Sequence, residues 1–205
     1  MYLILLGFAF ALSSCNSNNT RINEEQYITG LLKERKIKDK ELVDTTISRF
    51  NPEERARFTE KGLAYFPPDI SYRAVTKIKV DTSYPVFQMP TTTDRKPNYR
   101  IYGFLEFTLK DTLCKLIAYQ NMDYNDHPEY GGTLFIPFKD NTNEFTTYGG
   151  GRYIDIKIPD NEKFILDFNT AYNPYCAYSD RWSCPLVPSN NTLDLSVFAG
   201  EKAYK

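Results

Sequence analysis

Histidine, tryptophan and closely spaced cysteines are scarce in this sequence. Its 205 residues include one histidine, His127, and one tryptophan, and the four cysteines form no Cys-x-x-Cys pair. One histidine cannot provide a two-histidine metal site, and no Gly-x-Ser-x-Gly motif accompanies it as in a hydrolase triad. We therefore expect no metal site, no cofactor and no catalytic histidine.

An excess of charge of either sign is also missing. The chain has 25 basic and 26 acidic residues, which gives a formal net charge of -1. Proteins that bind nucleic acid or an anionic membrane through long-range electrostatics usually carry a basic excess. The overall charge therefore gives no case for a nucleic-acid partner or for an anionic membrane surface.

The apolar run near the N-terminus is too short to span a bilayer. It covers the eleven residues from Tyr2 to Leu12, whereas a membrane-spanning helix needs about 20. Its length suits the apolar part of an export signal, although no lysine or arginine precedes it. Either the amine of Met1 takes the place of that positive charge, or the true start of the protein lies upstream.

The run ends in Leu12-Ser13-Ser14-Cys15, which resembles the lipobox of bacterial lipoproteins. The resemblance implies a signal peptide at residues 1–14, acylation of Cys15 and a flexible tether over residues 15–21. Asn16 is not the aspartate that retains lipoproteins in the inner membrane of enteric bacteria. We therefore expect a lipid-anchored protein of the outer membrane that faces the periplasm. The alternative is an unprocessed buried strand with an incidental cysteine.

Residues 22–205 are expected to form a single domain that begins with helices at about 22–61. Apolar residues recur at helical spacing between Arg21 and Phe50, with charged residues on the other faces. A second helix start is indicated by Asn51-Pro52-Glu53-Glu54, where Asn51 can cap and Glu54 can complete a capping box. Gly62 is a plausible stop for this helix. The spacing predicts amphipathic helices packed on the outside of the domain.

Beyond about residue 70 the hydrophobic period changes from 3.6 to 2, which is typical of strands. The predicted strands are marked by apolar residues on one face, at Tyr72–Val80, Ile101–Leu109, Cys114–Ala118, Leu134–Phe138, Ile154–Ile158, Phe164–Phe168 and Leu193–Val197. No helical crossover separates them, so the pattern predicts an antiparallel β-sandwich or barrel at about 70–204.

Four motifs in the C-terminal half resemble those of a family known as a domain of unknown function, DUF1684. They are PFKDNTNEFTTYGGGRY, LDFNTAYNPYCAY, CPLVPSNNTL and AGE, in this order along the chain. The match covers about residues 50–204 and includes Asp140, Tyr148, Arg152, Asp167 and Glu201. The resemblance implies family membership but brings no reaction, substrate or cofactor with it.

The residues of these motifs predict a polar site around one arginine. Three consecutive glycines, residues 149–151, precede Arg152, so backbone N–H groups and the guanidinium can together hold an anion. Asp167 interrupts an apolar run and needs a partner, for which Arg152 is the natural choice, with amides from Asn169 and Asn173. The alternative is a bulged hairpin in which Arg152 pairs structurally with Asp155 or Asp167.

The remaining cysteines bear on stability more than on chemistry. Cys176 and Cys184 lie close in sequence, and in an exported protein a disulfide between them is the default. Free structural thiols, or a metal-binding or reactive pair, are the alternatives, because the DUF1684 family includes members without export signals that carry the same two cysteines. Cys114 is expected to be a small buried core residue.

Three hypotheses about function follow. The first is a ligand-binding lipoprotein that holds a small anionic or carbohydrate-like molecule in a pocket lined by Tyr148, Arg152, Asp167, Asn169 and Asn173. The second is a hydrolase that uses two of the carboxylates of Asp140, Asp167 and Glu201 as acid and base. The third is a structural or protein-interaction module of the cell envelope, in which the polar motif residues brace the fold. The expected partners are a membrane, through Cys15, and a small-molecule ligand.

Overall fold

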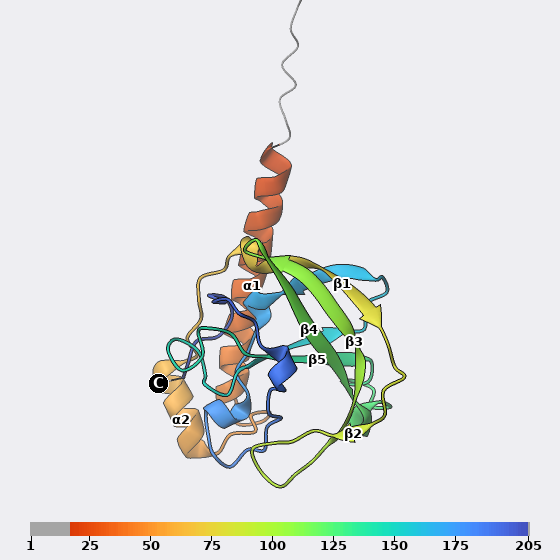
Figure 1. Ribbon diagram of the computed structural model, residues 1–205. Helices are drawn as coiled ribbons and strands as arrows, with labels where there is room; N and C mark the ends of the chain where they lie inside the picture. The colour runs from red at the N-terminus through yellow and green to blue at the C-terminus, as the bar shows by residue number, and fades with distance from the viewer. Residues whose placement is uncertain (1–16, 205) are drawn as a thin grey trace, which may run out of the picture.

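The computed structural model describes residues 17–204 (Figure 1). The predicted signal peptide, Cys15 and Asn16 lie outside the described residues. The chain forms two helices, seven strands and five short 3-10 turns, in the order α1 (Ser17–Val43), α2 (Pro52–Lys61), η1 (Ile70–Tyr72), β1 (Arg73–Val80), β2 (Phe87–Gln88), β3 (Asn98–Leu109), β4 (Thr112–Asn121), η2 (Met122–Tyr124), β5 (Thr133–Phe138), β6 (Arg152–Lys157), β7 (Lys163–Asp167), η3 (Phe168–Thr170), η4 (Tyr175–Ala177) and η5 (Ser189–Asn191).

The strands form one antiparallel sheet that curls into a half-barrel (Figure 1). Its strand order is β6-β5-β4-β3-β1-β7, and β2 pairs with β3 beside this path. A mainly antiparallel β domain is therefore confirmed. The two stacked sheets of a sandwich are not confirmed, because the described strands all belong to a single sheet. The edge strands of this sheet are β6 and β7, which do not pair with each other, so the described strands do not form a closed barrel either.

The period-2 pattern places the core where the sequence predicts it. Alternate residues of the strands are buried on one face of the sheet, including Leu105, Leu116, Leu134, Ile136, Ile154 and Leu166. A bulge between Ile101 and Gly103 shifts the register of β3 against β4. As a result Ile101 packs in a second cluster on the other face, with Tyr99 and Tyr119, and does not share a face with Leu105 as the sequence predicted.

The predicted final strand at Leu193–Val197 does not form. These residues are buried in the core but follow an irregular path, and Thr192 makes only an isolated bridge to Lys139. Backbone hydrogen bonds join Leu193 and Leu195 to residues 139 and 141 only briefly, and further along the Val197 carbonyl oxygen accepts from the Arg152 side chain, at 2.9 Å, in place of a neighbouring strand. The apolar alternation thus reports burial here and not strand pairing.

The second helix begins and ends as predicted. Asn51 caps α2, the reciprocal hydrogen bonds of a capping box join Asn51 and Glu54, and Gly62 ends the helix with a positive φ of 62°. The first helix differs at both ends. It begins at Ser17, inside the predicted flexible tether, and it ends at Val43, well before Phe50. No helix among residues 17–204 is both long and apolar enough to cross a membrane.

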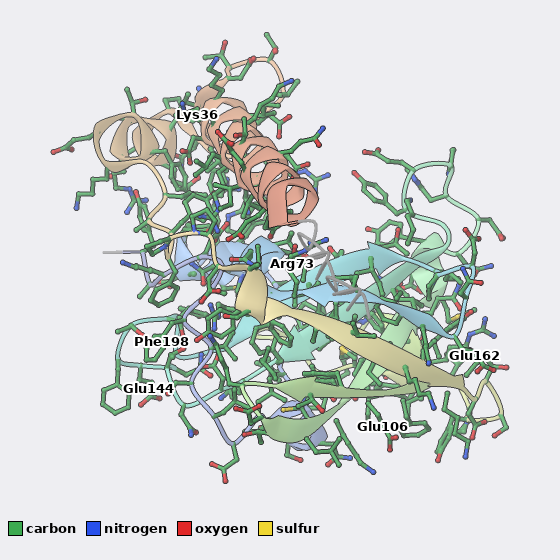
Figure 2. The ribbon with its side chains drawn as sticks, turned by 90° about the horizontal axis from the view of Figure 1, so that it is seen from above. Lys36, Arg73, Glu106, Glu144, Glu162 and Phe198 are labelled. Carbon is green, nitrogen blue, oxygen red and sulfur yellow. A yellow bond between two sulfur atoms is a disulfide. The ribbon has the colours of Figure 1, made fainter. Side chains whose placement is uncertain are left out.

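Helix α1 contacts the β domain mainly through polar side chains, whereas the sequence predicted an apolar face. Leu31 and Leu42 are buried, but Leu32 and Ile37 are exposed. Arg35, which is buried, donates to the backbone carbonyl oxygens of Phe66 at 2.8 Å and Asn169 at 3.1 Å. Figure 2 shows α1 beside the sheet, and Arg73 of β1 lies against Tyr27, part-way along the helix. The contact of the helix with the domain therefore depends on specific hydrogen bonds as well as on the burial of Leu31 and Leu42.

Candidate functional site

Arg152, the predicted anion-binding residue, is completely buried at the start of β6. Its Nη2 atom lies 2.6 Å from Asp140 Oδ2, and both side chains have no exposed surface. The guanidinium also donates to the carbonyl oxygens of Val197, Ala199 and Glu201. Arg152 therefore pairs with Asp140, and not with Asp155 or Asp167. Arg152 has no exposed surface, so a ligand atom could reach it only by displacing the C-terminal segment whose carbonyl oxygens it binds.

The last of the three glycines before Arg152 is explained by packing. Gly151 has a positive φ of 94°, and a Cβ atom there would lie 2.6 Å from Val187 Cγ2 and 2.7 Å from the Phe138 carbonyl oxygen. Its N–H donates to the Tyr148 carbonyl oxygen at 3.0 Å, as in a tight turn. This N–H is therefore already used within the turn and does not contribute to an anion-binding loop.

Asp167 belongs to a different contact, between β7, β1 and helix α1. Its Oδ2 atom accepts a hydrogen bond from the Tyr27 hydroxyl at 2.7 Å and lies 3.3 Å from Arg73 Nε. Its Oδ1 atom accepts from the backbone N–H of Asn169 at 2.9 Å. Burial, followed by the bond to the Asp167 carboxylate, raises the pKa of Tyr27 well above its ordinary value. Asp167 therefore anchors helix α1 to the sheet.

Glu201 and Asn173 form a third polar contact beneath α1. The buried Glu201 carboxylate lies 2.5 Å from Lys38 Nζ. It also accepts from the Tyr178 hydroxyl at 2.6 Å and from the Asn173 backbone N–H at 2.9 Å. Burial and the Glu201 charge raise the pKa of Tyr178 far above its ordinary value, so this hydroxyl stays a donor.

The structure therefore distributes the predicted site residues over separate contacts. Each of the three candidate carboxylates has its own cation: Arg152 for Asp140, Arg73 for Asp167 and Lys38 for Glu201. A catalytic acid and base must both reach one substrate, and each must be free to exchange a proton. The fully buried Asp140 cannot do so. Tyr148 is half-buried in the loop before Gly149 and is not a hydrogen-bond partner of Arg152 in the described contacts.

The disulfide between Cys176 and Cys184 is present, with Cα atoms 6.2 Å apart, as the sequence predicts. Cys114 is free and buried, and burial raises the pKa of its thiol. The loop closed by the disulfide carries Arg181, whose Nε and Nη2 atoms donate to Glu54 Oε1 and Oε2 at 3.0 and 2.8 Å. This bidentate pair joins the loop to the start of helix α2.

The Glu54–Arg181 pair predicts a stability loss in acid. The hydrogen bonds from Arg181 lower the pKa of Glu54 to about 2, below its ordinary value of 4.5. A carboxyl whose pKa is lower in the folded state stabilises the fold above pH 4.5 and ceases to do so as the pH falls towards 2. Thermal melts of wild type and Glu54→Gln should therefore converge over this range. The exposed neighbour Glu53 provides the control: Glu53→Gln should follow wild type, and an equal acid response of both variants would contradict the assignment.

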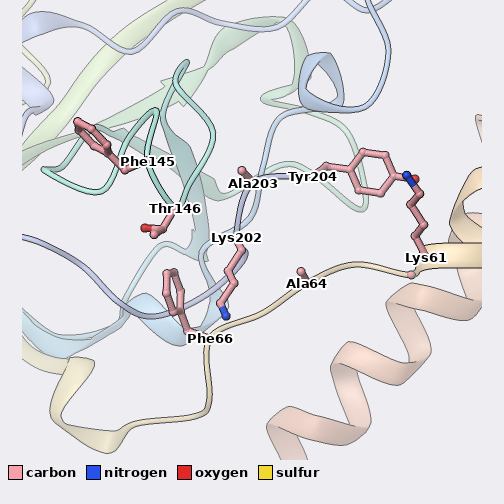
Figure 3. A pocket seen from close by; sticks show the side chains of 9 residues that line it. Lys61, Ala64, Phe66, Phe145, Thr146, Lys202, Ala203 and Tyr204 are labelled. Atoms are coloured by element: carbon pink, nitrogen blue, oxygen red, sulfur yellow. The ribbon is translucent and has the colours of Figure 1, made fainter.

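A surface groove that the sequence did not predict lies where the segment after α2 meets the C-terminal segment (Figure 3). Its volume is about 460 Å³, and it is lined by Lys61, Gly62, Ala64, Phe66, Phe145, Thr146, Lys202, Ala203 and Tyr204. Backbone hydrogen bonds hold residues 64–66 against residues 200–202: Phe66 N donates to the Gly200 carbonyl oxygen at 2.9 Å, and Lys202 N to that of Ala64 at 2.8 Å. Alternation along these extended segments places Phe66 and Lys202 at the groove, and Tyr65 and Glu201 towards α1.

Two features of the groove suit ligand recognition. Phe145 is 81% exposed, which is unusual for a large apolar side chain on a tight loop. Lys202 Nζ lies 4.9 Å from the centre of the buried Phe66 ring, so the ammonium group is held over an aromatic face at the base of the groove. One indication of this site was present in the motifs, since Phe145 lies within the first of them and Lys202 directly follows the last. The spacing alone did not show that they meet.

Comparison with known proteins gives a family and a fold, without an activity. A family model described as "Protein of unknown function (DUF1684)" matches residues 57–202. A solution NMR structure of an uncharacterized protein of Haloarcula marismortui is similar to this chain, with 36% identity and a TM-score of 0.66. The match covers 88% of this chain and 96% of the Haloarcula chain. Comparison with curated proteins gives no significant match.

Proposed function

Because this chain belongs to the DUF1684 family, which is described only as being of unknown function, we propose its role from its own residues. It acts as a lipid-anchored protein of the cell envelope that binds a small anionic or carbohydrate-like ligand. The ligand lies in the groove between Phe66, Phe145 and Lys202. This replaces the pocket around Arg152 that the sequence suggested.

The lining of the groove is the observation that carries the proposal. Ligand sites are typically concavities of about 300–1,000 Å³ with apolar walls and a few charged or polar groups. This groove has a volume of about 460 Å³, rings from Phe66, Phe145 and Tyr204, and the ammonium group of Lys202. Aromatic rings provide flat apolar surfaces for a sugar or hydrocarbon face, and a lysine provides a point charge for an anionic group.

The other two hypotheses explain less of this surface. Hydrolysis by paired carboxylates has no supporting observation, since each candidate carboxylate is paired with its own cation. A bracing role accounts well for Arg152 and Asp140. It does not account for the largely exposed Phe145, or for Lys202 in the lining of the same groove. We therefore combine the two ideas, with a polar brace that holds the chain ends together and a groove formed on them.

The groove predicts charge-selective binding. Titration of the mature protein with disaccharides of matched size should give heat of binding with carboxylated or sulfated sugars and little with neutral ones. Phe145→Ala and Lys202→Gln should each weaken binding about tenfold, equivalent to about 1.4 kcal/mol. Leu113→Ala and Lys33→Gln remove an exposed apolar side chain and an exposed charge elsewhere, so they are the matched controls. Equal losses in variants and controls would contradict the proposal.

The lipid anchor makes a separate prediction. The eleven-residue apolar run followed by Leu12-Ser13-Ser14-Cys15 supports processing as a lipoprotein, and Asn16 supports transfer to the outer membrane. Cells expressing the full chain should yield a mature protein that begins at Cys15, carries acyl chains and sediments with membranes. Cys15→Ser should release a folded soluble protein, because two or three acyl chains provide the stable part of such anchoring. Mass spectrometry that finds an unmodified chain starting at Met1 would refute the anchor.

A further inference from the structure

One face of the sheet, formed by alternate residues of β7, β1, β3 and β4, is left uncovered. Val75 on β1 is 66% exposed and Leu113 on β4 is 70% exposed. Val75 pairs with Ile165 of β7, which is exposed as well. Side chains two residues apart on a strand share a face, so these aliphatic groups lie on the same side of the sheet as the charged residues that follow them. The result is an apolar pair, Val75 and Ile165, at the outer surface, with Leu113 two strands away on β4.

A second row of this face is rich in lysine. Lys77 lies directly opposite Lys163 on β7 and opposite Glu106 on β3, and Glu106 in turn faces Lys115 on β4. Glu106 forms its ion pair with Lys115, at 2.9 Å. Among the described residues, neither Lys77 nor Lys163 has an acidic partner within ion-pair distance. Like charges placed directly opposite each other destabilise a sheet; Glu106 opposite Lys77 offsets part of this repulsion, and an anionic partner would offset the rest.

A third row continues the same surface. Lys79 pairs with Phe104 on β3, and a hollow of about 250 Å³ opens beside them, lined also by Lys115 and by its partner Glu106. The face therefore carries aliphatic side chains at one end and lysines with a shallow hollow at the other. A balanced net charge does not exclude such a local concentration, since these paired positions hold four lysines, at 77, 79, 115 and 163, and one acidic residue, Glu106.

Helix α1 brings the proposed membrane anchor to the edge of this face. The Arg73 guanidinium stacks on the Tyr27 ring, 4.3 Å from its centre, and the Tyr27 hydroxyl donates a hydrogen bond to Asp167. Arg73 and Asp167 lie opposite each other on the paired strands β1 and β7. Arg73 therefore lies beside α1 at the level of Tyr27, part-way along the helix. Ten residues separate Tyr27 from Ser17, a helical length of about 15 Å, and Cys15 precedes Ser17 by two residues. Acyl chains on Cys15 would thus keep a membrane within about 22 Å of this face.

We propose that this uncovered sheet face docks on the anionic membrane surface to which Cys15 tethers the chain. The inference rests on the lipid anchor proposed above. Lysines attract anionic headgroups, and exposed aliphatic side chains enter the boundary between headgroups and acyl chains. Because the tether keeps the local lipid concentration high, even a weak contact suffices to hold the domain in one orientation. The groove at Phe145 and Lys202 involves none of the residues of this face and stays available for a ligand.

The test uses the full mature chain with Cys15→Ser, so that docking is measured without acylation. We expect sedimentation with vesicles of phosphatidylcholine containing about 30% phosphatidylglycerol, and not with phosphatidylcholine alone. Lys77→Gln with Lys163→Gln should weaken binding about 30-fold, from about 1 kcal/mol for each lysine. Lys33→Gln with Lys36→Gln removes the same charge from exposed positions of α1 and should change binding less than twofold.

Several outcomes would overturn the docking proposal. They are the absence of binding to the anionic vesicles, equal losses in both double variants, and a dimer in solution that depends on Val75 and Leu113. Folding is not a concern for the key variant, because removing two opposed lysines relieves repulsion, and its thermal midpoint should not fall. The anchor is assessed independently by fractionation of the wild-type chain. A lipidated protein whose Cys15→Ser form ignores anionic vesicles would refute docking alone.

Discussion

Arg152→Ala should lower the free energy of unfolding by about 3–5 kcal/mol, the usual cost of leaving a buried charge without its partner. The Asp140 carboxylate would lose a cation at 2.6 Å in a place without exposed surface. The carbonyl oxygens of Val197, Ala199 and Glu201 would lose their donors at the same time. We expect the C-terminal segment to detach from the core, since these bonds replace the strand pairing that it lacks. Chemical denaturation would measure this loss as a lower midpoint, with an unchanged slope of unfolding free energy against denaturant concentration.

The matched comparison is the surface pair Lys115–Glu106. Its atoms are 2.9 Å apart, yet its side chains are 70% and 54% exposed. Lys115→Ala should therefore cost less than about 1 kcal/mol. If Arg152→Ala were no more harmful than Lys115→Ala, the polar motif residues would not brace the fold.

Gly200→Ala should be the next most damaging change, at about 2–5 kcal/mol. Gly200 has a positive φ of 75°, where an alanine is strained. Its Cβ would also lie 2.5 Å from the Ala171 carbonyl oxygen and 2.9 Å from that of Phe168, and backbone atoms cannot move aside cheaply. Gly200 leads directly into Glu201 and Lys202, so both the brace and the groove should be disturbed.

Gly132→Ala separates strain from crowding. Gly132 has a similar φ of 70°, but a Cβ there would meet nothing within 4 Å. Only the conformational cost remains, about 1 kcal/mol. Thermal or chemical denaturation of both variants should show the larger loss for Gly200→Ala. Equal losses would mean that the close approach at Ala171 is relieved without cost.

Local signals in the sequence predicted much of the fold. The capping box at Asn51, the change of period near Tyr72 and the Cys176–Cys184 pair each depend on residues close together in the chain. Such features are determined by short-range geometry, so their physical basis can be recognised without coordinates. The bulge at Ile101 and the irregular path of Leu193–Val197 could not be predicted, because hydrophobic alternation records burial and leaves the hydrogen-bond partners open.

The site could be predicted only in part, since it depends on long-range pairing. Several carboxylates near Arg152 in the sequence could have been its partner. That Asp140 is the partner depends on how residues 197–201 lie across the core. The groove joins Phe66, Phe145 and Lys202 from three distant segments. Net charge likewise concealed Lys77 and Lys163, which become neighbours only when β1 and β7 pair.

Mapping ligand contacts by NMR would test the central claim most directly, which is that the groove binds a ligand and the buried arginine does not. Backbone amide spectra of the mature protein should be followed during titration with a sulfated disaccharide. We predict shifts at residues 61–66, 145–146 and 202–204, which form the groove, with none at Asp140 or Arg152 beyond those of distant residues. The shifts should disappear in Phe145→Ala. Shifts centred on Tyr148, Arg152 and Asn169 with an unperturbed groove would contradict the account.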